Sequence, residues 1–258
     1  MLYDTTADVI RKALRGLDMA PSEAASIAGL PEREVLAASR GPVSPDTLRA
    51  LAPALHLDPA ALADLPAYHP PPCSLPAVHR LELPFDDETV NAWLLDDGAG
   101  GHLLFDAGNG RHDVRDALKR LGIPSVDVFI THSHHDHTGG LRGLGAMVRS
   151  VAGEDLNPGD RLQRGKLGIE VIDLPGHCPG ALGYIVEGLG TTVCVTGDAL
   201  FAGSIGGCAP GEHYHQAVEV LQSSVMILSP ETILLTGHGP SSTVASELRS
   251  NPFVARNA

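Results

Sequence analysis

The amino-acid sequence predicts an α/β fold preceded by a small all-helical domain. Three features lead to this prediction. Apolar residues recur at helical spacing through residues 1–66, residues 67–77 are rich in proline, and apolar segments of strand length alternate with helical segments from residue 78 onward. We therefore expect a helical domain at residues 1–66, a semi-rigid linker at residues 67–77 and an α/β domain at residues 78–258.

The helical region contains start signals for five short helices. The first helix carries an apolar stripe, and the later helices begin near Pro21, Pro31, Ser44 and Asp58. Five short helices with this spacing resemble the λ-repressor-like helix-turn-helix domain. That family places a recognition helix in the major groove of DNA, and the equivalent helix here would be residues 31–40.

Charge argues against a nucleic-acid partner. The chain carries a net charge of −13, and residues 1–66 alone carry −3. The expected recognition helix contributes Glu32 and Glu34, whereas DNA binding requires Lys and Arg to replace the counterions of the phosphates. We therefore expect residues 1–66 to serve packing or the formation of a homo-oligomer. A ligand-sensing regulator with a DNA-binding amino-terminal domain stays an alternative.

The α/β region is expected to have an aliphatic core, because hydrophobic residues make up 43% of the chain and aromatic residues only 4%. Helices are expected at residues 114–121 and 214–228. Strands are expected at residues 78–83, 90–95, 102–105, 126–130, 169–173, 182–186, 191–196 and 233–235.

The sequence indicates a cytoplasmic protein without a membrane partner. Residues 1–10 include two aspartates where a signal peptide would be basic, and no run of about 20 apolar residues occurs. The cysteines form no CxxC pair, so we expect free thiols, as in a reducing compartment, at Cys73, Cys178, Cys194 and Cys208.

The strongest chemical signal is residues 131–140, Thr-His-Ser-His-His-Asp-His-Thr-Gly-Gly, which directly follow a predicted buried strand. This segment holds the candidate ligands His132, His134, Asp136 and His137. Such a density of imidazole and carboxylate is typical of a cation site, because these groups otherwise compete for protons and solvation. Side chains two residues apart point to one side of an extended segment, so one loop can serve two neighbouring metals as it turns into a helix.

This H-x-H-x-D-H pattern after a strand resembles the signature of the metallo-β-lactamase superfamily. Residues 174–180, 195–198 and 236–240 resemble its later motifs in the same order, and residues 104–108 resemble its early strand. The resemblance covers residues 78–253 and implies an αββα sandwich.

The resemblance also implies two metal sites and a bridging carboxylate. Imidazole and carboxylate ligands suit two zinc ions, with iron or manganese as alternatives. Asp106 would hold the second nitrogen of a ligand histidine. The implied ligands are His132, His134 and His177 for the first metal, Asp136, His137 and His238 for the second, and Asp198 between them.

The implied chemistry is hydrolysis of a small-molecule substrate. Two metals that share one water lower its pKa, so that a bridging hydroxide attacks an ester or thioester-like carbonyl. Asp136 and Asp198 would act catalytically by orienting that hydroxide. His213 and His215 follow the loop after Asp198 and are candidates for substrate binding, although exposed positions at a helix start explain them equally well.

Within the superfamily, residues 198–206 and the segment after His238 resemble the glyoxalase II-like branch, which hydrolyses thioesters such as S-lactoylglutathione. The sequence therefore predicts a binuclear metallo-hydrolase similar to hydroxyacylglutathione hydrolases. Gly207 stands where that branch commonly has an arginine, so glutathione recognition does not follow from the resemblance. A mononuclear iron persulfide dioxygenase is the alternative within the same fold, and the complete second ligand set favours hydrolysis.

Overall fold

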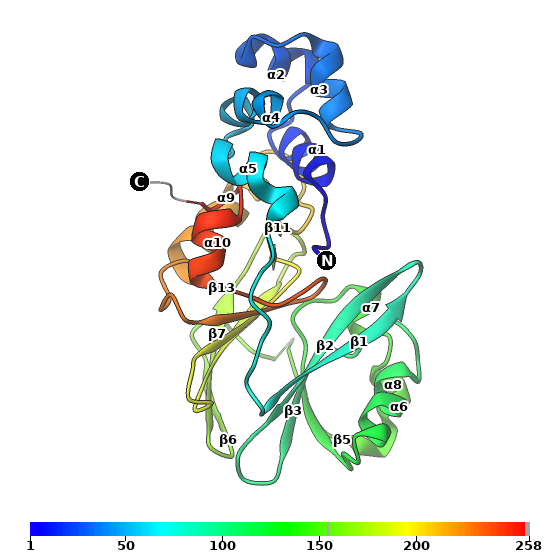
Figure 1. Ribbon diagram of the computed structural model, residues 1–258. Coiled ribbons are helices and arrows are strands. Elements are labelled where there is room, and N and C mark those ends of the chain that lie inside the picture. The colour runs from blue at the N-terminus through cyan, green and yellow to red at the C-terminus, as the bar shows by residue number, and fades with distance from the viewer. Residues whose placement is uncertain (154, 256–258) are drawn as a thin grey trace.

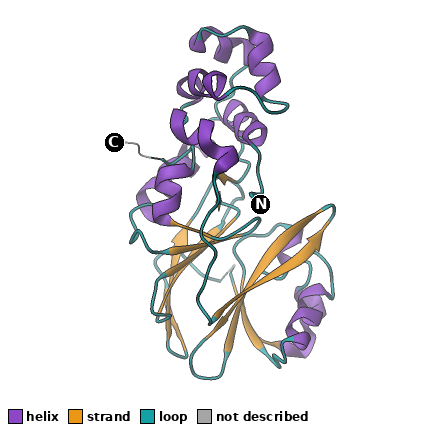
Figure 2. Ribbon diagram, in the orientation of Figure 1, coloured by secondary structure: helices purple, strands orange, loops and turns teal. Residues whose placement is uncertain are grey.

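The computed structural model describes residues 1–153 and 155–255. Two β-sheets lie face to face, and helices cover the outer face of each sheet (Figures 1 and 2). The expected αββα sandwich is thus confirmed, and the amino-terminal helices lie at one end of it.

The first sheet has the strand order β1-β2-β3-β4-β5. Strands β1 to β3 are antiparallel, whereas β3, β4 and β5 run parallel. Helices α6 (Asp113–Arg120) and α8 (Leu141–Leu144) cover its outer face through a core of Leu, Val and Ala side chains. The strands are β1 (Val78–Phe85), β2 (Glu88–Asp96), β3 (His102–Phe105), β4 (Val126–Phe129) and β5 (Val148–Ala152).

The second sheet has the strand order β13-β12-β9-β8-β7-β6, in which only the β9–β12 pair is parallel. The expected helix at 214–228 is shorter, because α9 (Glu212–Val220) passes into a π-helical turn at 221–225. The strands are β6 (Arg161–Arg164), β7 (Leu167–Asp173), β8 (Leu182–Glu187), β9 (Val193–Gly197), β12 (Ile233–Thr236) and β13 (Ser242–Thr243), with a hairpin of β10 (Leu200–Phe201) and β11 (Ser204–Ile205).

The core between the sheets is mainly aliphatic, as expected, but it contains one aromatic group. Phe105, Phe129 and Tyr184 form a buried aromatic group with ring centroids 5.2 to 5.5 Å apart. The hydroxyl of Tyr184 donates to the carbonyl of Ile130 at 2.5 Å. Three of the ten aromatic residues of the chain thus pack together beside the end of β4, directly before the His-rich segment.

The amino-terminal region contains five α-helices, as the start signals predict, and two short 3-10 helices at Ala52–Leu55 and Leu65–Ala67. They pack on α9, α10 (Val244–Ser250) and the outer face of the second sheet, so one hydrophobic core is continuous across both parts. None of the helices in residues 1–153 and 155–255 is long and apolar enough to cross a membrane. The five helices are α1 (Thr6–Gly16), α2 (Pro21–Ala28), α3 (Glu32–Ala38), α4 (Pro45–Leu51) and α5 (Pro59–Asp64).

Candidate metal centre

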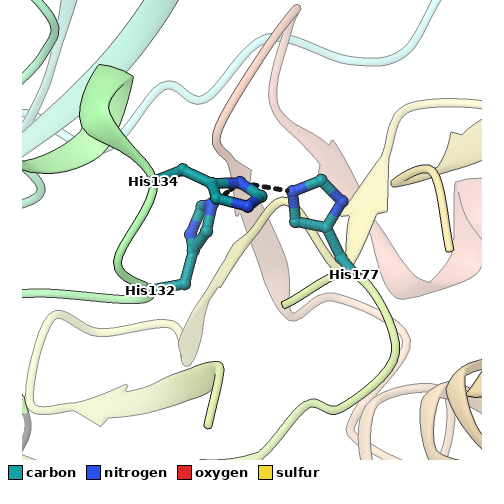
Figure 3. Close-up of side chains that lie close together, drawn as sticks. All are labelled: His132, His134 and His177. Carbon is teal, nitrogen blue, oxygen red and sulfur yellow. Dashed lines mark hydrogen bonds between the residues drawn. The ribbon is translucent and has the colours of Figure 1, made fainter. Parts of the chain in front are cut away.

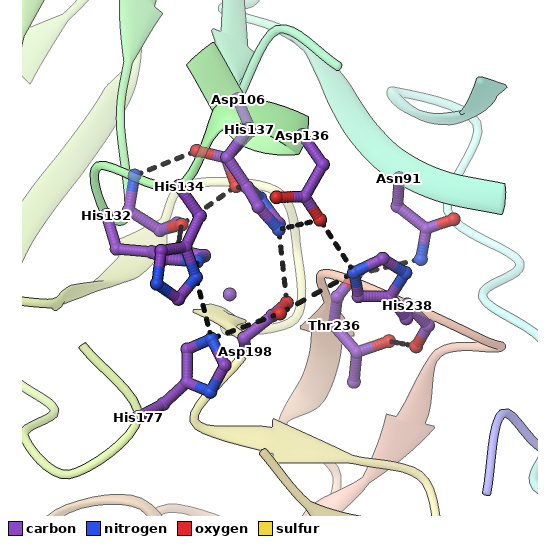
Figure 4. A network of polar contacts seen from close by, with 12 residues as sticks. Asn91, Asp106, His132, His134, Asp136, His137, His177, Asp198, Thr236 and His238 are labelled. Carbon is purple, nitrogen blue, oxygen red and sulfur yellow. Dashed lines mark hydrogen bonds and ion pairs between the residues drawn. The ribbon is translucent and has the colours of Figure 1, made fainter. Parts of the chain in front are cut away.

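The candidate ligands come from four separate segments, and their side chains point toward one another (Figure 4). The segment after β4 carries two histidines and leads into α7 (His135–Thr138), which carries Asp136 and His137. The loop after β7 carries His177, and the ends of β9 and β12 lead into Asp198 and His238. The fold therefore brings together all seven residues that the sequence pattern singles out.

The first cluster consists of His132, His134 and His177 (Figure 3). The Nδ1 atom of His134 lies 3.1 Å from Nε2 of His132 and 3.0 Å from Nε2 of His177. Nitrogen ligands on one tetrahedral zinc ion lie roughly 3.4 Å apart, because each Zn–N bond is about 2.0–2.1 Å long. Three imidazole nitrogens at this spacing match the ligand set of a single cation.

The second cluster consists of Asp136, His137, Asp198 and His238, and it is more deeply buried than the first. Nε2 of His238 lies 3.2 Å from Oδ2 of Asp136, and Nε2 of His137 lies 3.6 Å from that same oxygen. Asp198 faces both clusters, because its Oδ2 lies 3.5 Å from Nε2 of His177 and 3.5 Å from Nε2 of His238. Its position is that of a carboxylate shared by two neighbouring cation sites.

Four of the ligand histidines have their second ring nitrogen held by a neighbour. Nδ1 of His177 contacts the Gly207 carbonyl at 2.9 Å, and Nδ1 of His238 contacts the Thr89 carbonyl at 2.8 Å. Nδ1 of His132 contacts the Thr131 hydroxyl at 2.9 Å. Such partners fix the ring orientation and direct Nε2 into the site, as around ligand histidines of metal centres.

The fourth of these histidines, His137, is held by Asp106, whose Oδ2 lies 2.8 Å from Nδ1 of His137. The same carboxylate accepts hydrogen bonds from the backbone N–H and the hydroxyl of Thr131, each at 2.8 Å. Asp106 has a left-handed backbone, with φ of 63°, which Asp and Asn tolerate better than most residues. The turn after β3 thus aims one buried carboxylate at both ends of the His-rich segment.

The two clusters differ in the direction in which their imidazole pKa values shift. Burial, together with the neighbouring His137, lowers the pKa of His132 to about 4, and burial lowers the pKa of His177. Burial also opposes the charge of His137 and His238, but carboxylates beside them raise the pKa of His238 to about 9 and that of His137 well above its ordinary value. Protons can therefore balance the carboxylates of the second cluster when no cation is bound.

The surroundings of Asp198 fit a cation. Nε2 of His137 and Oδ1 of Asp198 are both buried and form no hydrogen bond, although they lie 3.3 Å apart. A Cβ atom on Gly237 would lie 2.0 Å from Oδ1 of Asp198, so only glycine leaves room beside that oxygen. A buried acceptor and a buried imidazole nitrogen without partners are costly unless a ligand satisfies them.

The amino-terminal segment also reaches this centre, a contact that the sequence analysis missed. The ring of Tyr3 stacks on His238 with centroids 4.5 Å apart and meets Phe201 edge-on at 5.0 Å. Burial and hydrogen bonding to Glu88 raise the pKa of Tyr3 above its ordinary value. No local sequence signal marks Tyr3, because its role arises from tertiary packing alone.

The proposed substrate-binding residues His213 and His215 are exposed side chains on α9. The cavity over the two clusters is lined by other residues, namely Tyr3, Asp4, Asp8, Lys12, Glu88, His177, Asp198, Phe201 and Gly207.

Comparison with known proteins agrees with this geometry. Residues 85–146 match the family model of the metallo-beta-lactamase superfamily. The chain is 27% identical over 184 residues to a probable metallo-hydrolase, YqgX, of Bacillus subtilis, covering 59% of this chain and 86% of that protein. It is 36% identical over 143 residues to a hydroxyacylglutathione hydrolase of Gloeobacter violaceus, covering 50% of this chain and 55% of that protein. The chain thus spans about half the length of that hydrolase.

Solved structures share the fold. The BLEG-1 B3 metallo-beta-lactamase superposes with a TM-score of 0.59 at 22% identity, over 69% of this chain and 100% of that chain. ETHE1 from Myxococcus xanthus superposes with a TM-score of 0.55 at 24% identity, over 70% of this chain and 85% of that chain. The chain therefore has the metallo-β-lactamase fold, and its sequence matches support a place in that superfamily.

Proposed function

We propose that the protein is a binuclear metallo-hydrolase that cleaves a small ester or thioester. The observation that carries the proposal is the pair of ligand clusters with Asp198 between them. His132, His134 and His177 would hold one cation and Asp136, His137 and His238 the other. The likeness to a probable metallo-hydrolase and to hydroxyacylglutathione hydrolases supports the same reaction class.

Two divalent cations in these clusters would supply Lewis-acid chemistry, which lowers the pKa of a shared water and polarises a carbonyl oxygen. The chain's own residues perform the remaining tasks. Asp136 and Asp198 accept hydrogen bonds from the attacking water and thereby orient it. Asp106 holds His137 in one orientation, and Tyr3 and Phe201 shield His238 from bulk water.

The cation requirement suits zinc, with iron or manganese as alternatives, because imidazole and carboxylate ligands accept all three. Elemental analysis of protein purified without added metal, paired with hydrolysis of a simple thioester, tests the proposal. We expect close to two metal ions per chain together with turnover, and a His132→Ala variant that loses turnover and the cation of the first cluster. A matched control is His135→Ala, since His135 is exposed and belongs to neither cluster.

Two further measurements, oxygen consumption and DNA binding, separate the remaining alternatives. About one iron per chain, with oxygen consumption on a persulfide and no thioester turnover, would identify a mononuclear dioxygenase and contradict the proposal. Binding of duplex DNA at low salt would indicate a regulator. The negative charge of residues 1–66 argues against that outcome.

A further inference from the structure

The cavity over the two clusters is walled in part by the amino-terminal residues. It has a volume of about 300 Å³ and reaches His177 and Asp198. Asp4, Asp8 and Lys12 belong to its lining, so the first two turns of the chain help to define what enters the site. Helix α1 is thereby part of the reaction site as well as of the helical region.

A larger cavity of about 860 Å³ adjoins the first and shares Lys12 and Gly207 with it. We call this second cavity the basic groove, because Arg11, Lys12 and Arg15 line it. Among the residues that the structure describes, Asp18 is the only acidic one in its lining. The groove begins beside the first cluster, since the Gly207 carbonyl contacts His177.

The three cations of the groove differ in how far they are already paired. Lys12 forms an ion pair with Asp4, donates to the Ile205 carbonyl at 2.7 Å and lies 4.8 Å from the ring centroid of Phe201. Arg11 pairs with Asp8 and donates to the Ser39 carbonyl at 2.6 Å.

Arg15 is exposed and makes no ion pair within residues 1–153 and 155–255. It lies four residues after Arg11, so both guanidinium groups project from the same face of α1. Arg15 is thus a guanidinium without an ion-pair partner among the described residues, in a cavity beside the reaction site of a chain whose net charge is −13.

The arrangement of charge also orients a substrate. Asp4, Asp8 and Glu88 line the small cavity over the clusters. Their negative charges disfavour an anionic group in this cavity, except where that group would contact the metal ions. The basic groove favours one. A substrate with an anionic end would therefore place its scissile carbonyl over the clusters and its anionic end along α1.

From this geometry, and resting on the proposed hydrolase function, we infer that the substrate is a thioester or ester whose leaving group ends in a carboxylate or phosphate bound by Arg15 with Arg11. In the reaction the water oxygen bonds to the acyl carbon and the carbon–sulfur bond breaks. One proton of the water passes to the departing thiolate. The products are a carboxylic acid and an anionic thiol.

Paired substrates test this inference. S-acetyl thioesters of ω-mercaptocarboxylic acids of increasing chain length are compared with their neutral ω-amides, and ω-mercaptoalkyl phosphates form a third series. We expect kcat/KM to favour the anionic members by about 5- to 10-fold, carried by KM, at the chain length that spans from the clusters to Arg15. The series with the larger preference distinguishes a carboxylate from a phosphate. The protein should carry no amino-terminal tag, because Tyr3 lies in the site.

Two charge-reversed variants test whether the preference for anionic substrates depends on Arg15. Arg15→Glu should abolish or invert the preference for the anionic over the neutral substrates, with Arg15→Gln as an intermediate. Arg120→Glu is the matched control, because Arg120 is likewise an exposed basic residue in the last turn of a helix, α6, and does not line the groove. This control should keep the preference in full.

Binding of adipate and of its diamide to the whole protein, by titration calorimetry, gives a readout that does not depend on turnover. We expect adipate to bind more tightly and Arg15→Glu to remove the difference. Equal kcat/KM for acids and amides in the unaltered protein would overturn the inference while leaving the proposed hydrolase in place. Absence of hydrolysis of every thioester, neutral ones included, would overturn the proposed function and the inference with it.

Discussion

The two ligand clusters lie side by side but are built differently. The first offers three imidazoles and no carboxylate of its own, and His134 in it is exposed. The second offers two imidazoles and two carboxylates, with His137, Asp198 and His238 buried. Carboxylates lower the charge of a site before the cation arrives, and burial strengthens their attraction for it. We therefore expect the second cluster to hold its cation more tightly, and the first to lose its cation first to a chelator.

The difference extends to the partners behind the ligands. Two ligands of the first cluster are held by a hydroxyl and a backbone carbonyl, from Thr131 and Gly207. The second cluster also has a backbone carbonyl behind one ligand, that of Thr89 behind His238, but adds the Asp106 carboxylate and the stacked ring of Tyr3. A cation site with a charged and aromatic support is more rigid than one on an exposed loop. In the proposed binuclear centre, the second cluster would therefore retain its metal and the first would exchange it more readily.

The largest effect is expected from removing Asp198, the carboxylate that the two clusters share. Asp198→Ala removes a carboxylate that faces His177 and His238, so both cations should be lost or weakened together. Thioester turnover should fall by more than the ~10- to 100-fold that an outer-sphere partner is worth. Metal content and kcat/KM are the measurements. Retention of one cation per chain would show that the clusters bind independently.

The opposite pKa shifts of the histidines in the two clusters should give the clusters a different pH dependence of metal affinity. At pH 7 the raised pKa values keep His137 and His238 protonated without metal, so a cation entering the second cluster displaces about two protons. The pKa of His132, about 4, and the lowered pKa of His177 mean that these two are already neutral and release none. Affinity at the second cluster should therefore rise with pH between 6 and 8, by about tenfold per unit for each proton, and more steeply than at the first cluster.

Titration calorimetry in buffers of different ionisation enthalpy counts these protons. A His134→Ala variant isolates the second cluster, and a His238→Ala variant isolates the first. Equal proton release in both variants would contradict the assigned difference between the clusters.

Asp106, which holds His137, should matter more for the second cluster than for the first. Asp106→Asn preserves the left-handed turn and an acceptor for the Thr131 N–H, but it turns an amide N–H₂ toward Nδ1 of His137. Metal affinity of the second cluster should fall by about 10- to 100-fold, whereas the first should change little. Competition with a chromophoric chelator measures both affinities. An equal loss at both clusters would show that Asp106 acts mainly through Thr131, which also contacts His132.

Those parts of the fold and of the metal centre that have a local sequence pattern could be predicted from the sequence, whereas those that depend on tertiary packing could not. The His-rich segment and the residues at strand ends carry a local pattern, so the ligand positions and the αββα order could be predicted. The aromatic packing of Phe105 on Tyr184 could not, because strand periodicity reports burial but not which neighbours meet. The place of Tyr3 is equally unpredictable locally, since it depends on α1 packing its Gly16 against Tyr214, about 200 residues away.

The smallest effect is expected from removing the contact between Tyr3 and His238. Tyr3→Leu removes the ring that stacks on His238 and should weaken the second cluster's hold on its cation by about 3- to 10-fold, because a single aromatic contact is worth about 0.5–1.5 kcal/mol. Tyr3→Phe keeps the ring and removes only the hydroxyl next to Glu88, so the metal affinity should stay close to that of the unaltered protein. Chelator competition on both variants is the measurement. If Phe weakens the cation as much as Leu does, the hydroxyl and not the stacked ring supports His238, and the support of the second cluster is polar throughout.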